Sequence, residues 1–448
     1  MQEHSLTTGS VWKNLLRFSL PIMGANLLQA MYGTVDLMVV GLFADAAQVS
    51  AVSTGSMTIQ TITGIITGLT MGCTVQLGHC IGMRDYKTAS RTVASSLALF
   101  VVLGLAMSGV IVFFAPAISS VMNAPADAFR DTVGYIRICG MGILCIVLFN
   151  AVSGMLRGIG DSKTPLILMG IACAANILGD LLLVGGFSMG SDGAAIATVA
   201  AQGLSVLAAA VIVKRRGLGF ETDPADLRPG RAETGKILKY GLPIAAQEAL
   251  TGVSFMVILA ILNTFGLVAS AGVGVAEKIC ALMFIIPGAM MSAVSAFSAQ
   301  NIGAGKPQRA KQAMYISMAV SFAIGICMFL ASFLYGIQLA GFFSNDPAVC
   351  AAAANYLRSY AVDCIIIGFN FSMMGYLNGL GKTGFVALQG ILSTFLVRIP
   401  VSFFMSKIPG VGLFQVGFAT PLATVFAIVI TILYLRMHRE SSGSSSAK

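Results

Sequence analysis

Charged residues are scarce in this chain. Asp, Glu, Lys and Arg together make up 10% of its 448 residues, whereas hydrophobic residues make up 56%. A soluble domain carries about a quarter of its residues as charged side chains, so this composition excludes an ordinary soluble protein. It predicts an all-α integral membrane protein, because apolar side chains must face the lipid bilayer as well as a core.

The chain also lacks the motifs on which most enzymes and nucleotide-driven machines depend. No segment resembles GxxxxGK[ST], which excludes ATP as the driving force. No Ser/His/Asp set, metal-ligand cluster or nucleic-acid-binding surface appears, so we expect no enzyme activity, no cofactor and no nucleic-acid partner. Its nine cysteines fall mostly in apolar segments without a CxxC pair, and we interpret them as small hydrophobic residues rather than a disulfide framework.

What the chain does contain is a series of long apolar stretches. A spanning helix needs about 20 apolar residues, and charged or Gly/Pro-rich breaks divide the sequence into twelve such stretches. They lie at about 14–42, 48–80, 87–117, 126–156, 164–187, 193–214, 235–264, 270–302, 310–341, 348–379, 384–406 and 413–436. Several are longer than a bilayer requires, so we expect tilted or extended helices.

The basic residues predict the orientation of these spans. With the N-terminus inside, the inner loops hold most of the Lys and Arg residues, among them Arg17, Arg84 and Arg439, and the outer loops hold little beyond Lys407. Positive charge collects on the cytoplasmic side of membrane proteins. We therefore expect a multi-pass protein of the plasma (cytoplasmic) membrane with both termini in the cytoplasm, and the net charge of +9 has the same origin.

The two halves of the sequence repeat. Short matches recur at a shift of 221 or 222 residues, among them Leu20-Pro21-Ile22 with Leu242-Pro243-Ile244 and Tyr135-x-Arg137 with Tyr356-x-Arg358. Six spans per half give both halves the same orientation, which predicts a parallel repeat of two six-helix bundles around a central cleft. The predicted domains are an N-terminal bundle at 1–213, a cytoplasmic linker at 214–233, a C-terminal bundle at 234–437 and a disordered tail at 438–448.

Ionisable residues inside the first bundle point to an ion or substrate path. A carboxylate within a span is expensive to keep and marks a functional site by default. Asp36 and Asp180 each lie about 15 residues from the inner end of their spans, so at 1.5 Å per residue they reach a similar depth. Asn176 shares a helix face with Asp180, and Thr198 lies at a compatible depth. Pro21, near the start of the first span, predicts a bend or hinge there.

Several motifs together resemble the multidrug and toxic compound extrusion (MATE) family, in its NorM/DinF-like bacterial branch. They are PIM…TVDLMVVG in the first span, Gln76-Leu-Gly-His-Cys-Ile-Gly, Leu156-Arg-Gly-Ile-Gly-Asp-Ser-Lys-Thr-Pro, Asn176-x-x-x-Asp180 and Gln300-Asn-Ile-Gly-Ala-Gly, within a resemblance that covers about residues 12–437. The resemblance implies a secondary antiporter that exports lipophilic, often cationic, drugs or metabolites in exchange for Na⁺ or H⁺. A monomer is expected.

The resemblance also implies a cation site in the first bundle. In that family an aspartate in span one and an Asn/Asp/Thr set in spans four to six bind the coupling ion, and Asp36, Asn150, Asn176, Asp180 and Thr198 match this set. Oxygen ligands of these kinds suit a hard cation, and the carboxylates can take protons instead. The alternative is that the amides and Thr198 join helices by packing, and by depth Asn150 fits the site least well.

The second bundle departs from this pattern, because the repeat shift places no acid at the positions equivalent to Asp36 and Asp180. It carries Glu248, Asp363 and Arg398 near mid-bilayer, where a buried arginine needs an acidic partner. We expect Arg398 to pair with at least one acid. Two readings stay open: a charge network that attracts cationic substrates, or acids that only neutralise Arg398. Glu277 and Lys278 are interpreted as an interface pair.

Two rival functions remain at this point. A flippase for a lipid-linked saccharide would need several basic residues facing the central cavity to hold a pyrophosphate, and only Arg398 qualifies. A membrane enzyme or receptor would need a catalytic set or a soluble sensor domain, and neither is visible. Neither the substrate nor the choice between Na⁺ and H⁺ follows from the sequence.

Overall fold

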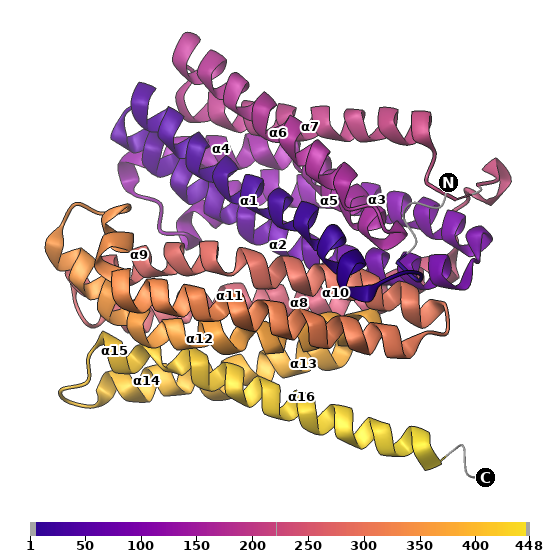
Figure 1. The fold of residues 1–448 in the computed structure, drawn as a ribbon. Coiled ribbons are helices and arrows are strands. Elements are labelled where there is room, and N and C mark those ends of the chain that lie inside the picture. The colour runs from indigo at the N-terminus through magenta and orange to yellow at the C-terminus, as the bar shows by residue number, and fades with distance from the viewer. Residues whose placement is uncertain (1–5, 221, 445–448) are drawn as a thin grey trace. The chain divides into compact units, whose positions relative to one another are not determined.

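The computed structural model describes residues 6–220 and 222–444, and every regular element within them is a helix (Figure 1). The chain forms two compact units. The first unit comprises the described residues up to Ala245 together with Ala296–Pro307, and the second comprises Ala246–Ser295 together with the described residues from Gln308 onward. Each unit is considered by itself below.

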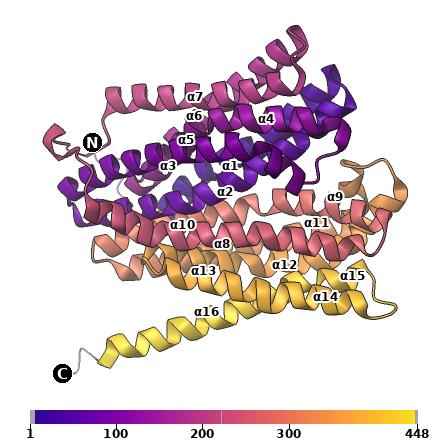
Figure 2. The ribbon, with the colours of Figure 1, turned by 180° about the vertical axis from the view of Figure 1, so that it is seen from behind.

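The first unit contains the helices of the N-terminal half and the beginning of α8. Its elements are α1 (Val11–Phe43), α2 (Ala46–Met83), α3 (Tyr86–Val121), η1 (Ala126–Ala128), α4 (Phe129–Met141), α5 (Ile143–Ile159), α6 (Lys163–Asp180), η2 (Leu181–Gly186), α7 (Gly190–Arg216), η3 (Pro224–Asp226) and the first part of α8 (Arg231–Asn263). Figure 2, seen from behind, shows α3, α5 and α7 running alongside one another in this unit.

The second unit contains the remaining helices, which follow the rest of α8. They are α9 (Leu267–Met283), most of α10 (Ile285–Gly303), α11 (Pro307–Gly341), α12 (Pro347–Gly379), α13 (Thr383–Leu392), η4 (Ser393–Arg398), α14 (Ile399–Lys407), α15 (Leu413–Gly417) and α16 (Ala419–Ser444). Because α16 continues to Ser444, the part of the predicted tail from 438 to 444 is helical, and residues 445–448 lie outside the described residues.

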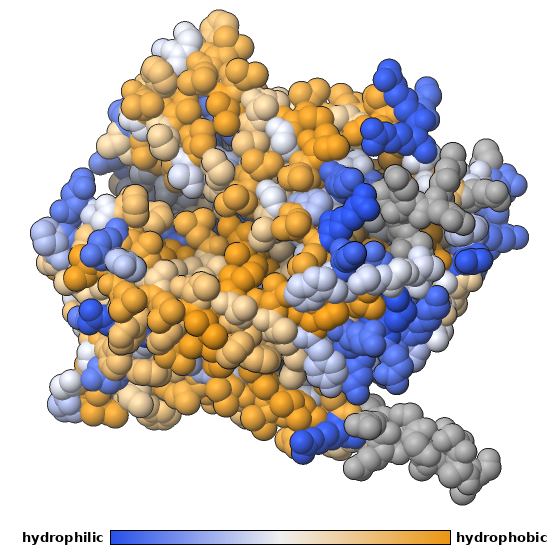
Figure 3. All heavy atoms as spheres, in the orientation of Figure 1, coloured by the Kyte–Doolittle hydropathy of each residue, from blue (hydrophilic) through white to orange (hydrophobic). Residues whose placement is uncertain are grey.

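The predicted membrane spans are confirmed. Eleven helical segments among the described residues are long and apolar enough to cross a bilayer, and the bent pair α4–α5 makes twelve. Large apolar side chains such as Phe113, Leu178 and Phe404 are 76%, 68% and 66% exposed, as expected of surfaces that face lipid. Figure 3 shows apolar side chains over the middle of the helices and hydrophilic ones gathered near their ends.

The bend between α4 and α5 has a local cause. The two helices meet at Gly142 with an angle of 51°. A Cβ at Gly142 would overlap the side chain of Val199 on α7, so only glycine lets α7 come this close. The fourth span is therefore broken rather than straight, which the apolar run from 126 to 156 did not reveal.

Burial identifies the central helix of each unit. In the most apolar window of α2, 72% of the residues are buried, compared with 17% in α1 and in α3. The corresponding value for α12 in the second unit is 67%. Thus α2 and α12 lie inside their units, and α1 and α3 present most of their surface outward.

The compact units do not follow the repeat boundaries. The first part of α8 packs against α2 backbone to backbone: a Cβ at Gly72 would overlap the Ile237 carbonyl, and one at Gly241 would overlap the Leu69 carbonyl. Glycines allow such close helix contact. These contacts place α8 as far as Ala245 with the first unit, whereas the repeat places the boundary in the linker before it.

The linker between the halves is anchored to the start of α3. The Gly230 amide donates a hydrogen bond to Ser95 Oγ at 2.9 Å, and Arg91 forms an ion pair with Asp226 at 3.7 Å. At the turn before α3, hydrogen bonds from the side chain and backbone of Thr88 hold the pKa of Asp85 below its usual value. The loop proper is shorter than predicted, because α7 extends to Arg216 and α8 begins at Arg231.

Candidate cation-coupling site

Two buried carboxyl groups meet inside the first unit. Asp36 on α1 is 2% exposed, and Asp180 at the end of α6 is fully buried. The two side chains lie side by side, and the Tyr135 side chain of α4 contacts Asp36. Helices α1 and α6 run together because Gly24 lets Leu166 approach and because Leu28 packs with Leu168 and Ala172.

Three further polar residues complete this cluster. The Tyr32 hydroxyl, one turn before Asp36, donates a hydrogen bond to the Thr198 carbonyl on α7 at 3.3 Å. Asn176 is fully buried one turn before Asp180. Gly179 holds α6 against Ala197 of α7, since a Cβ at Gly179 would lie 2.9 Å from the Ala197 Cβ. Asp180 and Thr198 directly follow these two residues, and the Tyr135 side chain contacts both Asp36 and Thr198.

The cluster holds more hydrogen-bonding capacity than its described neighbours satisfy. Among the described residues, no hydrogen-bond partner is found for Asp36 Oδ1, both Asp180 carboxylate oxygens, both Asn176 side-chain polar atoms or Thr198 Oγ1. Buried polar atoms are normally paired, and each exception calls for an explanation. Two adjacent carboxylates have no donor between them, so a shared proton or a cation would supply the missing partner.

The local helix geometry around Asp180 is unusual. The residues that follow it, Leu181–Gly186, form a π-helical turn, η2. Short π-helical segments interrupt the regular hydrogen-bonding of a helix and often occur at functional sites. A second π-helical segment, η4, ends at Arg398 in the second unit. Both key charged residues of spans five and eleven therefore lie beside such a segment.

Asn150 lies in a different setting from the other predicted ligands. Its side-chain oxygen accepts a hydrogen bond from Thr67 Oγ1 at 3.2 Å, and its Nδ2 donates to the Ile146 carbonyl at 2.8 Å. The first bond joins α2 to α5, and the second lies within α5. The structure thus brings Asp36, Asn176, Asp180 and Thr198 together and gives Asn150 partners of its own.

Tyr32 and Tyr135 are members of the cluster that sequence reasoning missed. Tyr32 precedes Asp36 by four residues and so lies on the same helix face. Tyr135 belongs to one of the repeat matches, whose second copy contains Tyr356, and the Tyr356 side chain contacts Glu277 in the second unit. In each repeat, therefore, this tyrosine contacts an acidic residue. The recurrence of the tyrosine in both halves of the sequence is the signal that could have identified Tyr135.

The charged residues of the second unit gather around Arg398. This side chain is 8% exposed, its Nε donates to Thr420 Oγ1 at 3.2 Å, and its guanidinium lies 4.7 Å from the centre of the Phe255 ring. Asp363 and Glu277 are close enough to act on it electrostatically. Neither forms an ion pair with it within 4 Å among the described residues, and both Asp363 oxygens and Arg398 Nη2 find no hydrogen-bond partner there.

Glu248 does not join this group, contrary to the network expected from the sequence. Its side chain is exposed on α8, and it lies seven residues before Phe255, the α8 residue that contacts Arg398. Seven residues correspond to roughly 10 Å along a helix, so Glu248 is two turns away from the guanidinium. Glu277, which we interpreted as an interface residue, is instead close enough to Arg398 to act on it electrostatically.

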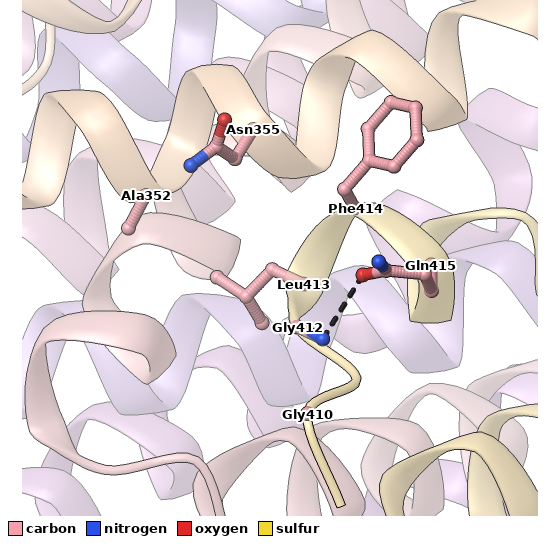
Figure 4. A pocket seen from close by; sticks show the side chains of 7 residues that line it. All are labelled: Ala352, Asn355, Gly410, Gly412, Leu413, Phe414 and Gln415. Atoms are coloured by element: carbon pink, nitrogen blue, oxygen red, sulfur yellow. Dashed lines mark hydrogen bonds between the residues drawn. The ribbon is translucent and has the colours of Figure 1, made fainter. Parts of the chain in front are cut away.

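A shallow hollow on the second unit shares no lining residue with either polar cluster. It is lined by the first turns of α12, with Ala352 and Asn355, and by residues around the start of α15, with Gly412, Phe414 and Gln415 (Figure 4). The Gly412 amide donates to Gln415 Oε1 at 2.9 Å. The lining includes no charged side chain, so we place no ion site in it.

A comparison with protein families matches the chain in both halves. The MatE family model fits residues 21–182 and again 243–404. The two copies begin at Pro21 and Pro243, the pair of prolines that the internal repeat aligns, which confirms the repeat. The two matches together cover well over half of the chain.

Relatives of known classification extend over the whole length. The probable multidrug resistance protein YpnP of Bacillus subtilis (strain 168) is 26% identical over 439 residues, which cover 98% of this chain and 98% of YpnP. The multidrug export protein MepA of Staphylococcus aureus (strain N315) is 23% identical over 425 residues, 94% of each chain.

Solved structures share the fold. A MOP superfamily transporter from Pyrococcus furiosus superimposes with a TM-score of 0.91 over 98% of both chains at 22% identity. An outward-facing multidrug resistance MATE family transporter gives a TM-score of 0.91 over 98% of both chains, also at 22% identity. With two copies of the family model, full-length relatives and this fold, the chain belongs to the MATE family and is a multi-pass membrane transporter, not an enzyme.

Proposed function

We propose that this protein is a secondary antiporter that exports lipophilic, often cationic, small molecules in exchange for Na⁺ or H⁺ by alternating access. The observation that carries the proposal is the contact between Asp36 and Asp180. Asp36 Oδ1 and both Asp180 carboxylate oxygens are buried and have no hydrogen-bond partner among the described residues. Two such carboxylates repel each other when both are charged. A proton or cation that enters the cluster relieves this repulsion, and its departure restores it.

The chemistry of the cluster fits reversible ion binding. Carboxylate, amide and hydroxyl oxygens from Asp36, Asp180, Asn176 and Thr198 suit a hard cation such as Na⁺. Protonation of one carboxyl group would also let it donate a hydrogen bond to the other. Because ion entry changes the contact between α1 and α6, it can favour one conformation over another, as coupling requires. We assign Pro21, inside α1, the role of the hinge in this change.

The flippase alternative finds less support. A lipid-linked pyrophosphate needs several cationic side chains in one cavity. In the middle of the second unit Arg398 is already engaged by Thr420 and Phe255 and lies near two acids. The acids near Arg398 favour a cationic rather than an anionic substrate. We therefore retain the antiporter, and we assign the protein to the cytoplasmic membrane as a monomer with both termini in the cytoplasm.

The first test separates the two possible coupling ions. In everted vesicles that contain the protein, we expect accumulation of a fluorescent cationic dye to follow either an imposed Na⁺ gradient or an imposed pH gradient, and to stop when that gradient is collapsed. ATP should have no direct effect. Dye movement that ignores both gradients would rule out the proposed antiport.

The Thr198 hydroxyl provides a sharper test of the site. It is buried and has no hydrogen-bond partner among the described residues, so Thr198→Val should leave thermal stability unchanged or slightly higher. If the hydroxyl binds the coupling ion, the ion concentration that gives half-maximal efflux should rise about tenfold.

Thr132→Val is the matched control for this change. Thr132 is also buried in the first unit, but its hydroxyl already donates to the Ala128 carbonyl at 2.8 Å. We expect it to leave the ion dependence unchanged. If Thr198→Val and the wild type show the same ion dependence, the Thr198 hydroxyl is not a ligand of the coupling ion.

A further inference from the structure

The last turns of α10 are held by the first unit although the rest of the helix belongs to the second. The segment Ala296–Pro307 is called the α10 end below; it is deeply buried as far as Asn301, whereas residues 305–307 are exposed. Phe297, Ala299 and Asn301 are fully buried and Gln300 is 1% exposed. A polar pair such as Gln300-Asn301 is buried at a helix end only where its side chains have partners.

Side-chain hydrogen bonds fasten the α10 end to two other segments. Gln300 Nε2 donates to the Gly158 carbonyl, at the end of α5, at 2.9 Å. Asn301 Nδ2 donates to the Leu6 carbonyl at 3.2 Å, and Lys306 Nζ donates to the Thr7 carbonyl at 2.9 Å. The segment before α1 thus lies across the α10 end, and three donors of one short stretch hold it to α5 and to that segment.

Backbone contacts with α2 accompany these bonds. A Cβ at Gly82 would overlap the Gln300 carbonyl, and a Cβ at Gly303 would overlap the His79 carbonyl. Gly78 also faces Ala299, where a Cβ would lie 2.6 Å from the Ala299 Cβ. The α10 end therefore touches α2 along two turns with no side chain between them, an arrangement that any added atom would force apart.

We propose that the α10 end is a releasable inner latch, with Gln300 as its principal fastening residue. The proposal rests on the transport cycle inferred above, in which the inner end of the protein must open and close. In this structure the latch is closed. The latch consists of a neutral side-chain hydrogen bond to one carbonyl and of glycine contacts without interlocking side chains. Such contacts can break and re-form as one event, whereas interdigitated apolar side chains would separate less readily.

Hydrogen–deuterium exchange of the detergent-solubilised full chain tests the latch. Gln300→Leu keeps the volume but removes the bond to Gly158. We expect exchange to rise about fivefold to tenfold in the α10 end. The same rise in exchange should appear in the three segments that contact the α10 end, because one opening event exposes all of them. These segments are the last two turns of α2, the end of α5 and residues 6–9. Fraying of α10 alone would accelerate exchange only in residues 296–307 and would overturn the proposal.

Gln389→Leu is the matched control. Gln389 is likewise 1% exposed, and its Nε2 donates to Asn370 Oδ1 at 2.9 Å, but both residues belong to the second unit. This variant should leave exchange at the latch unchanged. An equal rise at the latch in both variants would indicate general loosening and contradict a specific role for Gln300.

A pair of glycine variants gives an independent test should Gln300→Leu fail to fold. Gly303→Ala places a methyl group against the His79 carbonyl, whereas Gly288→Ala in the same helix meets nothing within 4 Å. The first should open the latch and the second should not. The exchange measurement compares variants at one fixed ion composition and needs no ion gradient. A failed gradient test with a positive exchange result would therefore refute the antiport and leave the latch standing, and the reverse result would do the opposite.

Discussion

Asp36→Asn and Asp180→Asn should each lower gradient-driven efflux about a hundredfold, because a ligand charge worth roughly 3 kcal/mol to the bound ion is lost. Each substitution also removes the repulsion between two buried carboxylates. The folded state should therefore be as stable as the wild type, or more stable. Loss of coupled transport together with unchanged or improved stability is the signature of a site maintained for ion exchange rather than for folding.

Dye efflux from vesicles and thermal unfolding of the purified variants would be measured together. Asp192→Asn is the control, since Asp192 lies in the same unit at the start of α7 and its side chain is exposed. Normal efflux in both single variants would contradict the assignment. So would an equal loss in Asp192→Asn, because the effect would then not be specific to the cluster.

The second large effect concerns stability. Arg398→Leu should destabilise the protein by about 3 to 5 kcal/mol, because it removes the cation near the buried Asp363 and the half-buried Glu277. Adding Asp363→Asn should recover much of this loss. Both Asp363 oxygens lack hydrogen-bond partners among the described residues, so neutralising this acid removes an uncompensated charge.

Thermal unfolding of the single and double variants measures this coupling. Glu248→Gln serves as the control and should not rescue Arg398→Leu, because Glu248 is exposed and two turns away from the Arg398 contact on α8. Rescue by Glu248→Gln but not by Asp363→Asn would show that the charges are paired differently. If Asp363→Asn alone instead lowers efflux of cationic dyes more than of neutral ones, Asp363 also contacts substrate.

The fold and half of the site geometry could be predicted because they depend on distances along single helices. A rise of 1.5 Å per residue was enough to predict that Asp36 and Asp180 lie at one depth, and they lie side by side. The helical spacing of Asn176 and Asp180 likewise put them on one face. The repeat around Pro21 and Pro243 predicted two bundles of equal orientation.

Helix rotation and backbone approach could not be predicted, since they depend on contacts between distant segments. Glu248 and Glu277 both lie in apolar stretches, and only packing decides that Glu277 lies near Arg398. Asn150 matches the expected ligand set by residue type, but its side-chain oxygen accepts a hydrogen bond from Thr67 on another helix. The break at Gly142 and the latch around Gln300 arise where glycines allow another helix to approach closely. The sequence alone does not show which helix packs against a given glycine.

Ion movement driven by substrate is the most direct measurement of the central claim. In proteoliposomes without an imposed ion gradient, a gradient of cationic dye should drive Na⁺ or H⁺ in the opposite direction in the wild type. An ion-sensitive probe should detect no such movement when Asp36 and Asp180 are both replaced by Asn. Ion movement in the same direction as the dye, or ion movement that persists in the double variant, would contradict the proposed exchange at this site.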